Sequence, residues 1–157
     1  MTHLPPAAAK VQTLLSELGS SAVVLELDGS ARTAAEAAAT LGCDVGAIGN
    51  SLVFMADGEP LLVITSGAHR VDTAALAARL GKTAIKRAAP EQVRAATGQV
   101  IGGVAPLGHP QPLETVVDRD LEKYDDVWVS AGTPYSVFRT DAGELLQLTG
   151  GSKQRVD

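Results

Sequence analysis

Two apolar runs joined by a tight turn constrain the fold of this chain more than any other feature. Residues 51–55 read Ser-Leu-Val-Phe-Met and residues 61–65 read Leu-Leu-Val-Ile-Thr, with Asp57-Gly58 between them. An Asp-Gly pair between apolar runs is a strong β-hairpin signal. Because both runs are almost continuously apolar, we expect a sheet that is covered on both faces. The hairpin excludes a purely parallel, doubly wound sheet.

The remaining sequence alternates between helical and strand patterns. Pro5 and Pro6 open a helix that Gly19 ends, and Ser30 is expected to cap an Ala-rich helix over residues 31–41. Asp72 is expected to cap a helix that ends at Gly81, Pro90 begins a helix that Gly98 ends, and a last helix covers 142–148. The other expected strands cover 23–27, 84–86, 114–118, 127–130 and 137–139. The polar tail from Ser152 is expected to fray. This order predicts one α/β domain over residues 1–157, with a central mixed β-sheet flanked by helices.

Composition and charge narrow the class of protein. The chain has 157 residues, of which 45% are hydrophobic and 20% charged, as in ordinary globular domains. Cys43 is the single cysteine, which excludes an internal disulfide and a Cys-rich zinc site. Neither a signal peptide nor a stretch long enough to cross a membrane is recognisable, so we expect a cytoplasmic protein. The net charge of −5 argues against broad DNA or RNA binding, but it allows a grip on one end of an RNA.

Few side chains point to standard chemistry. The sequence lacks HExxH, Walker, GxSxG and strand-linked GxGxxG motifs. His3, His69 and His109 are far apart along the chain, so we expect neither a metal site nor a cofactor. Cys43 follows a helix-ending glycine and is expected to be a buried small residue rather than a nucleophile. The basic cluster of Lys82, Lys86, Arg87 and Arg94, like Arg70, is either a solvated face or a contact for phosphate.

A Gly- and Pro-rich segment over residues 102–110 is the densest unusual feature. It reads Gly-Gly-Val-Ala-Pro-Leu-Gly-His-Pro. Adjacent glycines let a backbone approach a ligand closely, and Pro106 stiffens the loop. The segment is therefore either a plain irregular turn or a loop whose backbone orients a substrate or a water.

The same segment resembles the Gly-x-x-x-Pro loop of the YbaK/ProX family of aminoacyl-tRNA editing domains, which act freestanding or within prolyl-tRNA synthetase. Residues 47–54, Ala-Ile-Gly-Asn-Ser-Leu-Val-Phe, resemble the family segment where a loop enters a central strand. Residues 127–132, Val-Trp-Val-Ser-Ala-Gly, resemble its late strand and small-residue turn. These pieces occur in the family's order along nearly the whole chain.

The resemblance implies a hydrolase that cleaves the ester between an amino acid and the 3′-terminal adenosine of tRNA. An aminoacyl ester is already activated, so positioning a water or the neighbouring ribose hydroxyl can suffice without a metal or covalent nucleophile. The implied substrate is a small amino acid on a mischarged tRNA, and an aminoacyl-tRNA synthetase is a candidate partner. The implied catalytic residues are Gly102, Gly103 and His109, and the implied substrate contacts are Asn50, Ser51, Pro106, Ser130, Gly132 and Thr133.

Two of these residues allow alternatives. Many family members have a lysine where this chain has Asn50, which carries no charge and cannot replace a cation. The chain is therefore either a variant deacylase or a catalytically reduced relative that binds an aminoacyl-tRNA end or a nucleotide-like ligand, and Asn50 itself could simply be a loop residue. His109 either contacts the substrate or packs on a turn beside Pro110.

Overall fold

The computed structural model describes residues 4–157, so the expectations for His3 and the first two residues lie outside the described part. The strands are β1 (Val24–Glu26), β2 (Ile48–Ala56), β3 (Glu59–Ser66), β4 (Ile85–Arg87), β5 (Glu114–Asp118), β6 (Val127–Ser130), β7 (Ser136–Thr140) and β8 (Ser152–Gln154). The helices are α1 (Pro6–Glu17), α2 (Ala34–Leu41), α3 (Thr73–Leu80), α4 (Pro90–Thr97) and α5 (Ala142–Thr149), with short 3-10 helices η1 (Val45–Ala47) and η2 (Arg119–Lys123). Across residues 4–157, no helix is long and apolar enough to span a membrane.

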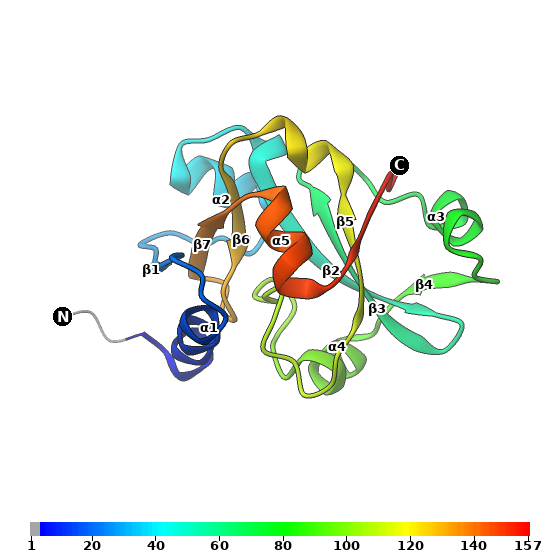
Figure 1. Cartoon of the computed structure of the whole chain (residues 1–157), viewed down its shortest axis with the longest axis horizontal. Helices are drawn as coiled ribbons and strands as arrows, with labels where there is room; N and C mark the ends of the chain where they lie inside the picture. Colours follow the sequence, from blue (N-terminus) through cyan, green and yellow to red (C-terminus); the bar gives the residue numbers. More distant parts are fainter. Residues whose placement is uncertain (1–3) are drawn as a thin grey trace.

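The eight strands of the described residues form one mixed sheet, which confirms the predicted mixed sheet, although the sequence did not predict the eighth strand, β8. Its order is β1-β7-β6-β2-β3-β5-β8, and β4 also pairs with β2 (Figure 1). The pairs β2/β6, β3/β5 and β5/β8 are parallel, whereas β1/β7, β6/β7, β2/β3 and β2/β4 are antiparallel. Long-range pairing therefore joins the first strand to the seventh and the third to the fifth.

The expected hairpin is the centre of the sheet. Asp57 has φ of 51° and Gly58 has φ of 83°, which is the left-handed geometry of a two-residue hairpin turn. The Asp57 carboxylate also accepts hydrogen bonds from the backbone N–H groups of Thr83 and Ala84, which attaches the turn to the start of β4. Both strands are longer than predicted. β2 starts at Ile48, which places Asn50 inside a strand rather than in a loop, and β3 runs from Glu59 to Ser66.

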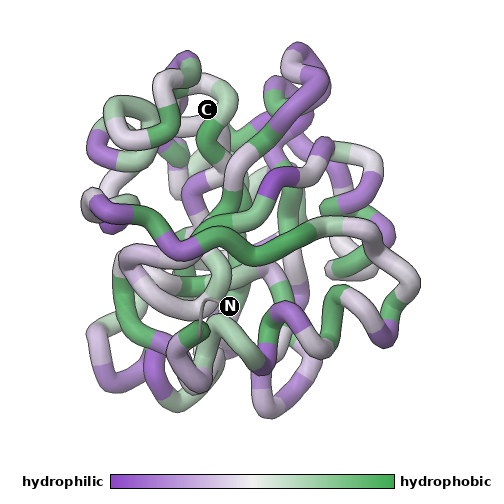
Figure 2. Tube along the Cα trace, turned by 90° about the vertical axis from the view of Figure 1, so that its left-hand side faces the viewer, coloured by the Kyte–Doolittle hydropathy of each residue, from purple (hydrophilic) through white to green (hydrophobic). Residues whose placement is uncertain are grey.

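Helices cover both faces of the sheet, which confirms the prediction from the apolar runs. One face packs against α1, α4 and α5 through a core that includes Leu15, Val93 and Leu145. The opposite face packs against α3 through Leu76 and against α2 through its alanines. Figure 2 shows that hydrophilic residues gather in the outer turns of the trace.

Three local predictions were wrong. Thr33, not Ser30, caps α2 by accepting a hydrogen bond from Glu36 N–H, and Ser30 instead accepts one from Arg32 N–H within the preceding turn. The strand expected over 23–27 is only Val24–Glu26. The tail does not fray, because β8 pairs with β5 and the Val156 side chain is fully buried against the α3 side of the sheet. The sequence of β8 carries no strand pattern of its own, because the strand is stabilised by pairing with β5. Ser152 pairs with Val116, which lies 36 residues earlier in the chain.

Candidate functional site

A gap in the sheet creates the candidate site. The edge of β2 that faces away from β3 pairs with β6 only at Ile48 and Gly49, and with β4 only at Phe54–Ala56. Between these two ladders, residues 50–53 have no strand partner on that edge within the described part of the chain. A cleft of about 280 Å³ lies there. It is lined by Arg32, Thr33, Ala34, Asn50, Ser51, Leu52, Val53, Arg87, Ala88, Val93, Ile101, Gly102 and Val104.

The backbone of Ser51 faces this gap. Gly67 N–H donates to the Ile48 carbonyl at 2.8 Å, so even-numbered residues of β2 use their backbone groups to bond toward β3. On the other edge, Ala88 N–H donates to the Val53 carbonyl at 3.2 Å. Because the direction alternates along a strand, Ser51 presents its N–H and C=O to the cleft.

The Ser51 side chain is also without a partner. Its Oγ is buried and, within residues 4–157, makes no hydrogen bond. Buried hydroxyl groups in folded proteins are nearly always hydrogen-bonded, because leaving one unpaired costs about 1–3 kcal/mol. An unpaired buried hydroxyl beside a cleft is therefore a position at which a ligand or a water would be bound.

The Gly-rich loop forms the wall opposite β2. Gly102 has φ of 87°, a left-handed conformation that favours glycine. Gly103 N–H donates to the Val100 carbonyl and Ala105 N–H donates to the buried side chain of Gln99, each at 2.9 Å. In the described part of the chain, the N–H groups of Gly102 and Val104 donate to no protein acceptor. The loop is thus held by Gln99, while two of its backbone donors have no protein partner among the described residues.

The structure brings some of the predicted site residues together. Asn50, Ser51 and Gly102 line the cleft, and Asn50 with Ser130 also lines a small adjoining recess. Gly103 packs on the backbone of the Thr133–Pro134 turn, since a Cβ on Gly103 would lie 2.7 Å from the carbonyl carbon of Thr133.

The other predicted residues are not among those that line the cleft. Pro106 is buried in the loop, and Gly132 packs on the Ala7 backbone of α1. His109 Nε2 is 2.8 Å from the Ala105 carbonyl, and burial lowers the pKa of His109 from its ordinary value of 6.5. Half-buried Cys43 is also outside the cleft, and burial raises the pKa of its thiol, which disfavours the nucleophilic thiolate.

Sequence reasoning missed the residues that reach the cleft from other elements. Arg32 and Thr33 come from the turn before α2, and nothing in their local sequence marks them. Arg87 belongs to the basic cluster noted from the sequence and is the one member of that cluster that lines the cleft. Lys82 instead pairs with Glu114 at 3.0 Å. Arg70 is exposed in the loop after β3.

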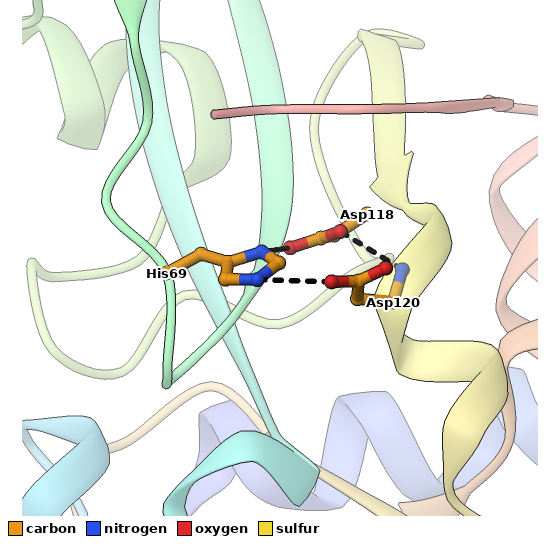
Figure 3. Close-up of side chains that lie close together, drawn as sticks. All are labelled: His69, Asp118 and Asp120. Carbon is orange, nitrogen blue, oxygen red and sulfur yellow. Dashed lines mark hydrogen bonds and ion pairs between the residues drawn. The ribbon is translucent and has the colours of Figure 1, made fainter.

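A second polar cluster lies at the end of β5 (Figure 3). His69 Nδ1 is 2.8 Å from Asp118 Oδ2, and His69 Nε2 is 2.9 Å from Asp120 Oδ2. The buried Asp118 also accepts hydrogen bonds from Ser66 N–H and Thr65 Oγ1. Imidazole and carboxylate groups are ligands that suit a divalent cation, and these three lie within 4.8 Å of one another. The sequence did not predict this cluster, because His69 is far from the two aspartates along the chain. The ring nitrogens already contact both carboxylates, so the cluster ties the loop after β3 to β5 and η2.

Comparisons with known proteins identify the family and the fold. A solved structure of a candidate trans-editing enzyme for prolyl tRNA synthetase is 41% identical, with a TM-score of 0.90 and 99% of both chains covered. EbsC of Enterococcus faecalis, named as a candidate Cys-tRNA(Pro)/Cys-tRNA(Cys) deacylase, is 26% identical over 120 residues, 76% of this chain and 73% of EbsC. Proline--tRNA ligase of Nitratidesulfovibrio vulgaris is 33% identical over 99 residues, 63% of this chain but 17% of the ligase. The sequence-family model of the aminoacyl-tRNA editing domain matches residues 28–148, and the chain belongs to that family.

Proposed function

We propose that this protein is a trans-editing aminoacyl-tRNA deacylase, which hydrolyses the ester of a mischarged tRNA. The observation that carries the proposal is the unpaired, buried Ser51 Oγ at the gap in the sheet. It marks a place where a polar ligand atom completes the hydrogen bonding of the protein. Among residues 4–157, no histidine, cysteine or carboxylate side chain lines the cleft.

The chemistry fits these donors. An ester carbonyl develops negative charge on its oxygen when water or the neighbouring ribose hydroxyl attacks. Preorganised N–H donors stabilise that charge, and losing one such donor costs about 10²–10³ in rate. The Ser51 N–H and the open N–H groups of Gly102 and Val104 are the donors that we assign to this oxygen. The Ser51 hydroxyl is then free to hold the attacking water.

His109 has no direct part in this proposed step. Its Nε2 already contacts the Ala105 carbonyl, and the lowered pKa keeps the imidazole neutral near pH 7. We assign His109, together with Pro106, Gly132 and Thr133, to holding the loop in place. This revises the direct roles that the family resemblance implies for them.

The proposed substrate carries a small amino acid. The recess that adjoins Asn50 has a volume of about 10 Å³ and is walled by Ala31, Ala34, Ala37 and Val137 among others. A space of that size holds about one water-sized group. Each additional methylene on the amino acid changes the ratio of kcat/KM between two substrates by only roughly 10–200-fold. Features of the tRNA or a synthetase partner would therefore supply further selectivity. Two relatives carry names that associate them with prolyl-tRNA editing, and we extend that association to this chain, acting in the cytoplasm.

The test is release of amino acids from a panel of mischarged tRNAs. Ser51→Ala removes the unpaired hydroxyl, so we expect slower hydrolysis with no fall in Tm, because no protein hydrogen bond is lost. Ser66→Ala is the matched control, since the buried Ser66 Oγ donates to the Gly46 carbonyl at 2.8 Å and Ser66 does not line the cleft. That control should lower Tm while the folded enzyme keeps its rate. A wild-type protein that hydrolyses none of the panel would refute the proposal.

Neutral Asn50 supports a second candidate, a relative that binds an aminoacyl-tRNA end without hydrolysing it. Asn50→Ala and Asn50→Lys distinguish the two functions on one mischarged tRNA. In an active enzyme, Asn50→Ala should lose one neutral hydrogen bond, about 0.5–1.5 kcal/mol or roughly 2–13-fold in rate. A silent wild type in which hydrolysis appears only with Asn50→Lys would establish the binding function instead.

A further inference from the structure

Two arginines flank the cleft without an acidic partner. Arg32 and Arg87 both line it, both are exposed, and neither forms a salt bridge within the described residues. The basic side chains that do pair are elsewhere: Lys82, Lys123, Arg139, Lys153 and Arg155. In the part of the chain that the structure describes, no Asp or Glu lines the cleft, although the whole chain has a net charge of −5. The cleft is therefore a local cationic site on an acidic protein.

The base of the Arg32 side chain is held in place. Its backbone N–H donates to Ser30 Oγ at 3.1 Å, and the next residue, Thr33, caps α2. Its Cγ lies 2.5 Å from the position that a Cβ on Gly102 would take. The aliphatic stem of Arg32 thus crosses Gly102 where a larger residue would displace it, and the guanidinium group is free for an external anion.

Arg87 reaches the cleft from another wall. It is the last residue of β4 and pairs with Phe54 of β2 in the sheet register. The next residue, Ala88, donates its N–H to the Val53 carbonyl at 3.2 Å, so the backbone is fixed on both sides of Arg87. The two guanidinium groups therefore belong to separate, ordered elements that meet at one cleft.

We propose that Arg32 and Arg87 bind the phosphate groups next to the terminal aminoacylated nucleoside and so hold the ester over Ser51. This inference rests on the proposed function, and it assigns the contact for the RNA backbone within that site. Guanidinium groups bind phosphate through two parallel N–H donors, which favours arginine wherever phosphate is recognised. Neutral Asn50, which is half-buried in β2, is then left to contact the ester or the ribose.

The experiment compares two substrates that differ in phosphate. One is the mischarged tRNA, and the other is the same amino acid esterified to adenosine without any phosphate. Arg32→Gln and Arg87→Gln should each lower kcat/KM for the tRNA about tenfold, which is the effect of losing about 1.4 kcal/mol. Each should leave hydrolysis of the aminoacyl-adenosine unchanged. Arg119→Gln, which alters an exposed arginine outside the cleft, is the matched control and should change neither rate.

Salt dependence gives an independent readout. Each lost contact to single-stranded phosphate should reduce the log–log salt slope by about 0.7, so the double variant should lose about 1.4. Binding of the uncharged tRNA measures this slope even for a protein that does not hydrolyse esters.

The possible results separate this inference from the proposed function. An active wild type whose arginine variants keep full tRNA activity and an unchanged salt slope overturns the inference alone. Equal losses on both substrates also overturn it, because they show that the arginines act without phosphate. A wild type that hydrolyses neither substrate refutes the proposed function, and the slope for uncharged tRNA then decides the inference.

Discussion

Gly102→Ala provides the sharpest test of how the loop works. The substitution has two costs in this structure. An alanine at φ of 87° costs about 1–2 kcal/mol relative to its preferred conformations. Its Cβ would also lie 2.5 Å from Arg32 Cγ, so the arginine stem must move. We expect Tm to fall by roughly 2–8 °C, because 1 kcal/mol shifts the Tm of a domain of this size by about 2–4 °C.

Gly102→Ala should lower the rate of hydrolysis by more than its loss of stability alone would explain. Moving the Arg32 stem displaces the proposed phosphate contact, and changing φ at Gly102 turns its open N–H away from the ester. Hydrolysis of mischarged tRNA at a temperature well below Tm should therefore drop by at least about tenfold, the expected effect of losing Arg32 alone. Gly103→Ala differs, since its Cβ would meet the Thr133–Pro134 backbone rather than a flexible side chain. That variant should lose stability by the overpacking mechanism, about 1–3 kcal/mol.

A double-mutant cycle separates the two costs of Gly102→Ala. In an Arg32→Ala background the Cγ is absent, so only the backbone strain remains and the alanine should destabilise less. A difference between backgrounds measures the contact between the two residues. Urea unfolding of the four proteins gives the free energies. Equal destabilisation in both backgrounds would show that the arginine stem does not rest on Gly102. A folded, fully active Gly102→Ala variant would show that this loop is not the catalytic element.

Three further predictions concern stability. Thr33→Ala should cost about 1 kcal/mol by removing the cap of α2, whereas Ser30→Ala should cost less, and equal falls in Tm would contradict the cap assignment. Val156→Ala should cost about 1.5 kcal/mol at roughly 0.8 kcal/mol per buried methylene, while a value near zero would mean that the tail does not pack. Burial lowers the pKa of His109 below 6.5, so the unfolded chain takes up this proton first as the pH falls and the free energy of unfolding decreases below about pH 6.5. His109→Gln should remove that part of the pH dependence in urea titrations at pH 5.5 and pH 7, and an unchanged difference between the two pH values would count against it.

The elements that depend on local chemistry could be predicted from the sequence. The Asp57-Gly58 turn, the Asp72 cap and the glycines that end helices act through neighbouring backbone groups. Asp72 accepts a hydrogen bond from Ala75 N–H, and Gly81 and Gly98 have φ of 70° and 71°. Each of these signals lies within four residues of the group that it satisfies, so pattern reasoning could reach it.

The candidate site was harder to predict because its walls come from distant segments. Arg32, Ser51, Arg87 and Gly102 belong to four separate segments that meet at the cleft, and the pairing of β2 with β4 is what places Arg87 there. Strand pairing depends on which edges are free in three dimensions, and local propensity carries no record of that. For the same reason the sequence did not predict the polar cluster of His69, Asp118 and Asp120, since the two aspartates lie 49 and 51 residues further along the chain.

The start of β2 shows why the failed prediction is informative. Gly49-Asn50 reads as a loop before the strand expected over 51–55, because glycine and asparagine are poor strand formers. The structure nevertheless extends the strand through them, because backbone bonds to β3 run on to Ser66. Gly49 has no room for a side chain, since a Cβ there would lie 2.8 Å from Val129 Cγ1, and Ser51 leaves a hydroxyl unpaired. Residues that weaken a strand are costly unless another role retains them. Here residues of low strand propensity lie in a strand at the point where the sheet opens. A binding site built into a β-sheet is expected to produce this conflict between propensity and fold.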